Sequence, residues 1–333
     1  MDITFGVDSF IWTENFLEKD LWVIKKAEEL GFKVIDFAIA HPETFPTEKV
    51  IEELKKTSLI PVTTTTLDDQ RNLLSEDARI RENGVRSMKL LVDINKKLGS
   101  KILGGVNYAG WGCLSGKPRT NEEWSNSVNA MKEICEYALQ VYPDLNICVE
   151  CVNRFETHFL NIAEDAVQYC KDVGTSNIKV HLDCFHMIRE EKSFSGAVKT
   201  CGKKYLGYVH VNENDRGIPG TGLVPFPELF NALKEVGYEG PCTIESFDPS
   251  FKELNSNCAI WRSFAPTGEA LAIEGLKNLK EIIYIFLTIF LYLLKCPQSL
   301  ILSALRAFCF CGKPHISRSI FLYFRYQAWL KSW

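Results

Sequence analysis

Short apolar runs alternate with longer amphipathic segments along the first 281 residues of the chain. Each run is long enough for a buried strand, and each following segment has the 3.6-residue spacing of a helix with one apolar face. The sequence contains eight such runs, at residues 3–10, 34–39, 61–66, 101–106, 146–152, 178–186, 205–213 and 241–247. Eight successive strand–helix units in this length predict a closed (β/α)8 TIM barrel.

The boundaries of the predicted helices support this interpretation. Gly31, Gly99, Gly174 and Gly237 follow amphipathic segments directly, as glycines do when they end a helix in the left-handed conformation. An open, doubly wound sheet is the alternative, and it normally has a glycine-rich turn after its first strand. The segment "GVDSFIWTEN" (6–15) contains no such turn, so the barrel is favoured.

Residues 282–333 have a different composition. They contain six basic residues and no Asp or Glu, so this segment carries a charge of +6 while the first 281 residues carry −10. Residues 282–294 are apolar apart from one Thr, and this run of 13 is shorter than the roughly 20 residues of a membrane span. We therefore expect a catalytic barrel over 1–281 and a basic, aromatic tail over 282–333. The abrupt change within the last helix favours a non-native extension, and membrane-surface association is the alternative.

Charge and cysteine content restrict the cellular setting. The acidic body has no basic stripe, which argues against nucleic acid as a partner. The first 16 residues contain no Lys or Arg, so no secretory signal is expected. The 12 cysteines are mostly scattered, and several lie in apolar runs, which is typical of reduced thiols in a cytoplasmic protein.

Ionisable residues stand at the ends of four successive predicted strands. These are Glu150, Asp183, His210 and Glu245. Catalytic groups of a TIM barrel lie at this end of the strands. Burying one such group alone is costly, whereas four that converge can share a cation. Three carboxylates and one imidazole suit Mn²⁺, Co²⁺ or Mg²⁺ better than zinc, so a metal site is favoured over separately satisfied buried residues.

The segments "VECVNRFE" (149–156), "HLDCFHM" (181–187), "HVNENDRGIPGTG" (210–222) and "IESF" (244–247) resemble the D-tagatose 3-epimerase family, which includes the D-psicose (allulose) 3-epimerases. The resemblance extends from residue 3 to about residue 281, within the wider group of xylose-isomerase-like barrels. It implies that Glu150, Asp183, His210 and Glu245 bind the metal, most simply Mn²⁺, and that Glu150 and Glu245 are the acid/base pair.

The resemblance also implies a substrate pocket. Glu156, His186 and Arg216 match the positions that hold the C1 to C3 end of a ketose, and Trp12 and Trp111 match aromatic positions that shape the pocket. The segments "NYAGWGCLSG" (107–116) and "TTTT" (63–66) depart from the family pattern. The preferred sugar, of the D-tagatose, D-psicose, D-fructose or L-ribulose type, therefore stays open.

The implied reaction is C3 epimerisation of a free ketose through an enediolate. An aldose–ketose isomerase or a sugar-phosphate epimerase on the same barrel is an alternative, and "GIPGTG" (217–222) beside Arg216 is the candidate phosphate site. A second alternative is a non-catalytic barrel that binds a sugar or is tethered to a membrane. Dimers or tetramers are implied by the resemblance. Of the other histidines, we expect His181 to be packed in the barrel and His41 to be solvated.

Overall fold

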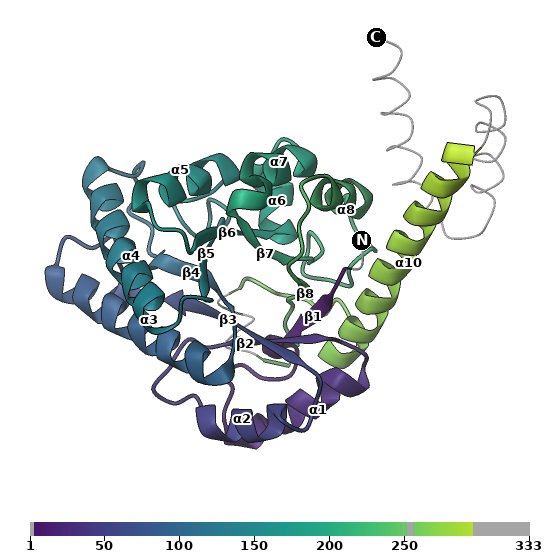
Figure 1. The fold of residues 1–333 in the computed structure, drawn as a ribbon, viewed down its shortest axis with the longest axis horizontal. Coiled ribbons are helices and arrows are strands. Elements are labelled where there is room, and N and C mark those ends of the chain that lie inside the picture. Colours follow the sequence, from purple (N-terminus) through teal and green to yellow (C-terminus); the bar gives the residue numbers. More distant parts are fainter. Residues whose placement is uncertain (1–2, 249, 252–255, 257, 296–333) are drawn as a thin grey trace, which may run out of the picture.

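The computed structural model describes residues 3–248, 250–251, 256 and 258–295, with side chains described up to residue 285. Eight strands pair in parallel and close into one barrel in the order of the chain (Figure 1). The strands are β1 (Phe5–Asp8), β2 (Val34–Ala38), β3 (Ile60–Leu67), β4 (Ile102–Gly110), β5 (Asn146–Glu150), β6 (Ile178–Asp183), β7 (Leu206–His210) and β8 (Cys242–Ile244). The predicted barrel is confirmed.

Helices surround the barrel (Figure 1). They are α1 (Trp22–Glu29), α2 (Thr47–Leu54), α3 (Ala78–Leu98), α4 (Asn121–Val141), α5 (Ala163–Val173), α6 (Cys184–Glu190), α7 (Phe194–Tyr205), α8 (Phe226–Glu235) and α10 (Gly268–Lys295). Local signals fix their ends. Asp77 accepts a hydrogen bond from the Arg79 amide at the start of α3, and Gly99 ends the helix at φ 72°.

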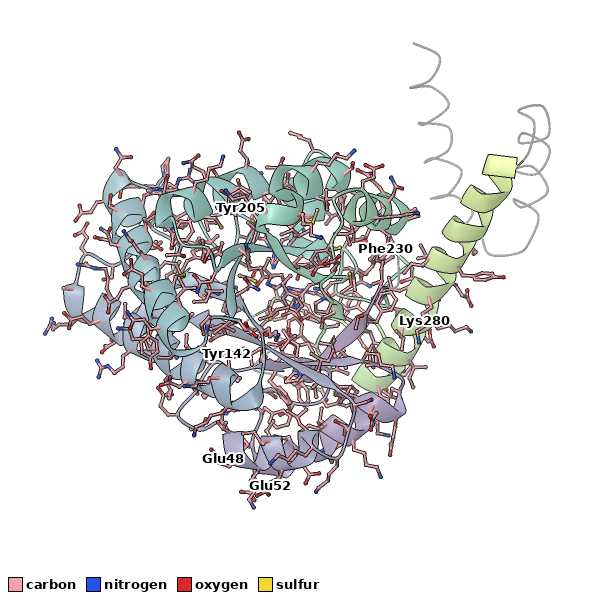
Figure 2. The ribbon with its side chains drawn as sticks, viewed as in Figure 1. Glu48, Glu52, Tyr142, Tyr205, Phe230 and Lys280 are labelled. Carbon is pink, nitrogen blue, oxygen red and sulfur yellow. The ribbon has the colours of Figure 1, made fainter. Side chains whose placement is uncertain are left out.

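The core lies inside the barrel and between the barrel and its helices. Buried aromatic rings fill one part of the outer layer, where Phe159 packs against Tyr108, Trp124 and Tyr169 with centroid distances of 5.4 to 6.0 Å. Charged side chains such as Glu48 and Lys280 point outward from the helices (Figure 2). The described cysteines carry free thiols, and most of them are buried.

Most strand boundaries differ from the sequence prediction by one to four residues, and two differences bear on the site and on the tail. The predicted strand 178–186 is three residues too long, because Asp183 ends β6 and starts α6 by accepting a hydrogen bond from the Phe185 amide at 2.6 Å. At the other end, α10 continues to Lys295, and Ile282 is part of the buried core. The barrel therefore packs against the first residue of the predicted tail, whereas residues 296–333 lie outside the described part of the chain.

Membrane association was the alternative for the tail. Within the described residues, no helix combines the length and the apolar character that crossing a bilayer requires.

Candidate metal and catalytic site

The carboxyl ends of four strands bring the predicted metal ligands together. Glu150, Asp183 and His210 are the last residues of β5, β6 and β7, and Glu245 directly follows β8. Asp183 lies opposite His210 in the strand register. One potential ligand atom from each of the four residues lies within 4.8 Å of the other three. The sequence pattern therefore corresponds to one compact cluster at the mouth of the barrel.

The orientation of His210 fits a metal ligand. Its Nε2 lies 3.3 Å from Oδ2 of Asp36, a buried carboxylate on β2. Its Nδ1 is buried without a hydrogen-bond partner, 3.3 Å from Glu245 Oε2 and 3.6 Å from Asp183 Oδ2. An imidazole held by a carboxylate at one nitrogen and free at the other is the usual arrangement of a metal-binding histidine. With three carboxylates beside it, the donor set fits a hard divalent cation.

Arg216 and Asn212 fix two of the carboxylates. The Arg216 guanidinium donates to Asp183 Oδ2 at 3.1 Å and also to Glu245 Oε2. The Asn212 amide donates to Asp183 Oδ2 at 2.7 Å, and its carbonyl accepts from the Glu245 backbone N–H at 2.6 Å. Arg216 has a φ of 63°, and its carbonyl accepts from the Ser246 hydroxyl at 2.6 Å. The loop after β7 is thus shaped to present this arginine to the cluster.

The two glutamates of the cluster have opposite electrostatic environments. Burial, together with the charges of Glu245 and Asp183, raises the pKa of Glu150 well above its usual value. Burial also opposes the charged form of Glu245, but Arg216 and His210 outweigh it and hold the pKa of Glu245 well below its usual value. Paired carboxyl groups whose pKa values are pushed apart are typical of an acid and a base in one site.

A second group of predicted residues borders the cluster. Glu156 accepts from Trp111 Nε1 at 2.8 Å and from the Asn153 amide at 2.7 Å. His186, which lies on α6, accepts at Nδ1 from the Asn153 backbone N–H, and its Nε2 lies 3.7 Å from Glu150 Oε1. The predicted substrate residues Glu156, His186 and Trp111 are therefore linked to one another and to Glu150.

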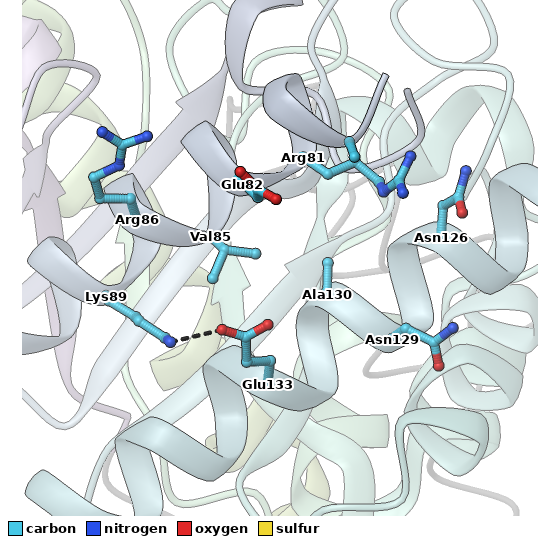
Figure 3. A pocket seen from close by; sticks show the side chains of 10 residues that line it. Arg81, Glu82, Val85, Arg86, Lys89, Asn126, Asn129, Ala130 and Glu133 are labelled. Carbon is cyan, nitrogen blue, oxygen red and sulfur yellow. Dashed lines mark hydrogen bonds and ion pairs between the residues drawn. The ribbon is translucent and has the colours of Figure 1, made fainter. Parts of the chain in front are cut away.

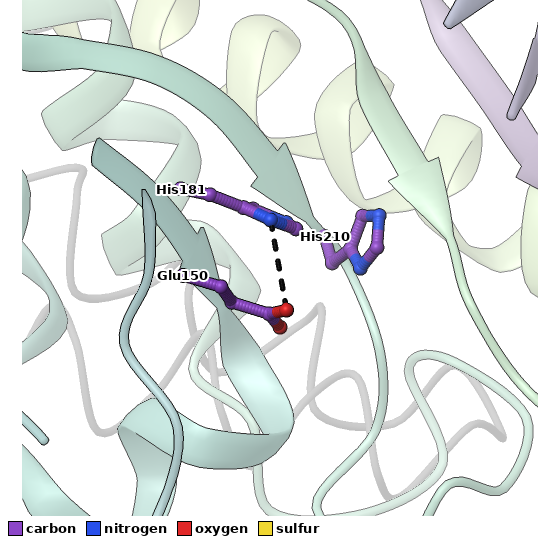
Figure 4. Close-up of side chains that lie close together, drawn as sticks. All are labelled: Glu150, His181 and His210. Atoms are coloured by element: carbon purple, nitrogen blue, oxygen red, sulfur yellow. Dashed lines mark ion pairs between the residues drawn. The ribbon is translucent and has the colours of Figure 1, made fainter. Parts of the chain in front are cut away.

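The remaining predicted positions are Trp12, His181 and His41, and of these His181 borders the cluster. Trp12 follows the short 3-10 helix after β1, packs against the core, and has a buried Nε1 with no hydrogen-bond partner. His181 is buried, accepts at Nδ1 from the Gly105 N–H at 3.3 Å, and lies 3.8 Å from Glu150 (Figure 4). Burial lowers the pKa of His181 well below its usual value, so this histidine is neutral and packed, as expected. His41 is exposed.

Four residues of the site were not singled out from the sequence: Asp8, Asp36, Asn153 and Asn212. Asp8 and Asp36 carried a readable signal, because each is a lone acid in an apolar strand run, "FGVDSF" (5–10) and "VIDFAI" (34–39). Glu150 was identified as an ionisable residue at the end of an apolar strand, and the same criterion applies to Asp8 and Asp36. The two asparagines gave no comparable signal, since asparagine is common in loops.

Two of the cavities that the described residues form lie outside this cluster. One, of about 520 Å³, is a groove between α3 and α4 on the outer ring of helices, where Lys89 and Glu133 form an ion pair at 2.7 Å (Figure 3). The other, of about 440 Å³, lies among the loops after β3, β4 and β5 and includes His158, which pairs with Glu123 at 3.0 Å. Neither is lined by a residue of the four-residue cluster. The barrel mouth therefore holds the strongest candidate chemistry.

Comparison with known proteins places the chain among sugar-converting barrels. Residues 24–282 match the family described as xylose isomerase-like TIM barrel. The chain belongs to this family. A D-psicose 3-epimerase of Ruminiclostridium cellulolyticum is 32% identical over 265 residues, which cover 78% of this chain and 89% of the relative. An L-ribulose 3-epimerase of Mesorhizobium japonicum is 32% identical over 270 residues, which cover 80% of this chain and 90% of the relative.

A solved structure of a ketose epimerase is also similar to this chain. The D-allulose 3-epimerase of Methylomonas sp. in complex with D-allulose superposes with a TM-score of 0.79 at 29% identity, covering 84% of this chain and 96% of that protein. The resemblance to ketose 3-epimerases that the motifs indicated is confirmed.

Proposed function

We propose that this protein is a ketose 3-epimerase that acts on a free sugar and depends on a divalent cation. The observation that carries the proposal is the convergence of Glu150, Asp183, His210 and Glu245 within 4.8 Å at the barrel mouth. Relatives that share nearly their full length with this chain are named D-psicose 3-epimerase and L-ribulose 3-epimerase. We assign Mn²⁺ as the first choice, with Co²⁺ and Mg²⁺ as alternatives, because the donors are mainly oxygen.

Glu150 and Glu245 are proposed to exchange the proton at C3. Epimerisation removes a proton from the carbon beside the carbonyl and returns one to the opposite face, which requires two groups on different sides of that carbon. Glu150 ends β5 and Glu245 follows β8, and these strands stand three apart in the closed barrel, so the two glutamates can approach a central sugar from different directions. One acts as base while the other acts as acid, and the roles reverse for the other epimer. A divalent cation, when bound, supplies Lewis-acid stabilisation for the charge that develops on the C2 and C3 oxygens.

The neighbouring polar residues are proposed to orient the sugar. Glu156, His186 and Arg216 would hydrogen-bond the oxygens at the C1 to C3 end, and the Trp111 indole N–H holds Glu156 in place for this role. Trp12 would form part of the apolar wall of the pocket. The charge of Arg216 is already paired with Asp183 and Glu245, which argues against its use as a phosphate ligand and favours a sugar without phosphate.

Incubation of purified protein and Mn²⁺ with a panel of ketohexoses and ketopentoses, with and without phosphate groups, tests this proposal. We expect interconversion of C3 epimers for at least one free ketose and none for the phosphorylated forms. Formation of an aldose would instead favour an aldose–ketose isomerase. If no sugar is converted, a non-catalytic sugar-binding barrel becomes the better account.

A further inference from the structure

A fifth acidic residue, Asp8, stands at the barrel mouth beside the cluster. It is the last residue of β1 and lies opposite Asp36 in the register of β1 and β2. Val7 lies opposite Ile244, so Asp8 and Glu245 occupy neighbouring positions on adjacent strands. Strands in a sheet lie about 4.8 Å apart. Asp8 therefore belongs to the same end of the barrel as the acid/base pair.

The register also gives the direction of the Asp8 side chain. Gly6 lies opposite Thr243, and Thr243 lies opposite His210, which faces the cluster. Residues paired across parallel strands face the same side of the sheet, and so do residues two positions apart in one strand. Asp8 is two positions from Gly6, so its side chain points into the barrel, on the side of His210.

The Asp8 carboxylate has one satisfied oxygen and one that is not. Its Oδ1 accepts from the Phe10 N–H at 2.6 Å and caps the short 3-10 helix Ser9–Ile11. Its Oδ2 is buried and has no hydrogen-bond partner, and no other carboxylate oxygen among the described residues is in this state. Leaving a buried polar atom unpaired costs stability, so a role in capping alone does not explain why a full carboxylate stands here.

We propose that Oδ2 of Asp8 accepts a hydrogen bond from a hydroxyl in the C4 to C6 part of the ketose. This inference rests on the proposed function. In a closed ring of eight strands, β1 stands opposite β5. Glu156 and His186 follow β5 and β6 and are assigned to the C1 to C3 end, so the other end of the sugar extends toward β1. The same segment after β1 carries a buried, unpartnered donor, Nε1 of Trp12.

This arrangement makes Asp8 a specificity-determining residue. Its side chain has no exposed surface, so neighbouring side chains must move aside to admit the hydroxyl. The bond then forms away from water, where an acceptor that is left unpaired discriminates strongly against sugars lacking the hydroxyl. Ketoses deoxygenated at the recognised carbon would be poor substrates.

The test compares Asp8→Ala with wild type on the best-converted ketohexose and on its 4-, 5- and 6-deoxy analogues. Leaving the sugar hydroxyl without its buried partner corresponds to roughly 5- to 150-fold in kcat/KM, so we expect a loss of this size on the parent sugar. On one deoxy analogue we expect the variant and wild type to differ by less than about 3-fold, because the bond is missing in both.

Two further variants separate recognition from structure. Asp8→Asn keeps the cap to Phe10 but places an NH2 group, which donates, where Oδ2 would accept the sugar hydroxyl. We therefore expect its preference for the parent sugar over the deoxy analogue to fall toward that of Asp8→Ala, with the fold preserved. Asp68→Ala is the matched control, because Asp68 caps another short helix after β3 by accepting from the Gln70 N–H. Asp68→Ala should leave the ratio of kcat/KM on the parent sugar to kcat/KM on each deoxy analogue at its wild-type value.

Three results would overturn the inference. Unchanged kcat/KM in Asp8→Ala excludes any contact with the sugar. An equal loss on the parent and all three deoxy analogues makes Asp8 a structural residue. A wild-type protein that converts no ketose at all overturns the proposed function itself, and the two failures are thereby distinguishable.

Discussion

Asp36 offers a sharp test of how the cluster is held in place. Its Oδ2 accepts from the Tyr208 hydroxyl at 2.6 Å and faces His210 Nε2 at 3.3 Å, while its Oδ1 accepts from the Thr64 hydroxyl at 3.1 Å. With Nε2–H directed at Asp36, the lone pair of His210 Nδ1 faces the carboxylates. Asp36→Asn has nearly the same shape and can turn its carbonyl to Tyr208 and His210, so the fold should be preserved.

The expected loss follows from the role of the partner carboxylate. Mutating the carboxylate that hydrogen-bonds a metal-binding histidine and raises its basicity typically weakens metal affinity by about 10- to 100-fold. This corresponds to roughly 1.4 to 2.8 kcal/mol. We therefore expect Asp36→Asn to bind Mn²⁺ 10- to 100-fold more weakly than wild type and to regain most of its activity when Mn²⁺ is in excess.

Isothermal titration of EDTA-treated, dialysed protein with Mn²⁺ measures this affinity. Asp20→Asn is a matched control, because Asp20 is another buried acid but bonds the Leu17 N–H, away from the cluster. Its Mn²⁺ affinity should equal that of wild type. The reasoning is refuted if Asp36→Asn binds Mn²⁺ as tightly as wild type, or if excess Mn²⁺ restores none of its lost activity.

Four more predictions follow from the same account. Glu150→Gln and Glu245→Gln should each lower kcat by about 10²- to 10⁴-fold with unchanged circular dichroism, and full activity in either would contradict the acid/base assignment. Phe159→Ala should lower the free energy of unfolding by about 3 to 5 kcal/mol in urea titrations, since the ring is buried among three others; a change below 1 kcal/mol would argue against this packing. Burial, with the charges of Asp36 and Glu245, raises the pKa of Asp8, so the folded protein favours the protonated form of this carboxyl group. The contribution of that protonated group to the stability of the fold is complete below about pH 4 and is lost as the pH rises. Asp8→Asn should therefore gain thermal stability over wild type as pH increases toward 8, and a constant difference would be inconsistent with this. Deletion of residues 290–333 should leave solubility and activity intact if the tail is a non-native extension, and an insoluble or inactive product would contradict that origin.

Much of the fold was predictable because it depends on local patterns. The alternation of apolar runs with amphipathic segments predicted all eight strands, and Gly31, Gly99, Gly174 and Gly237 all have the positive φ expected of helix-ending glycines. The end of β6 was misplaced because "DCFHM" (183–187) is as apolar as a strand. Asp183 accepts a hydrogen bond from the Phe185 amide there and caps the start of α6.

The cluster was predictable for a different reason. An ionisable residue at the end of an apolar strand is visible in the sequence, and the barrel brings every strand end to one place. The contacts around the cluster depend on geometry across the barrel, which no local pattern contains. Asn212 bonds Asp183, and Asp36 meets His210 although the two are 174 residues apart in the chain. Such pairs become apparent only once the barrel is closed.

Proton exchange at C3 is the central claim, and reaction in D₂O tests it most directly. Purified protein with Mn²⁺ is incubated in D₂O with the ketose it converts, and the sugars are followed by NMR. Proton removal and return by Glu150 and Glu245 predict deuterium at C3 in both epimers, and no incorporation after EDTA treatment. Deuterium at C1 with formation of an aldose, or C3 exchange that persists in Glu150→Gln and Glu245→Gln, would contradict the account.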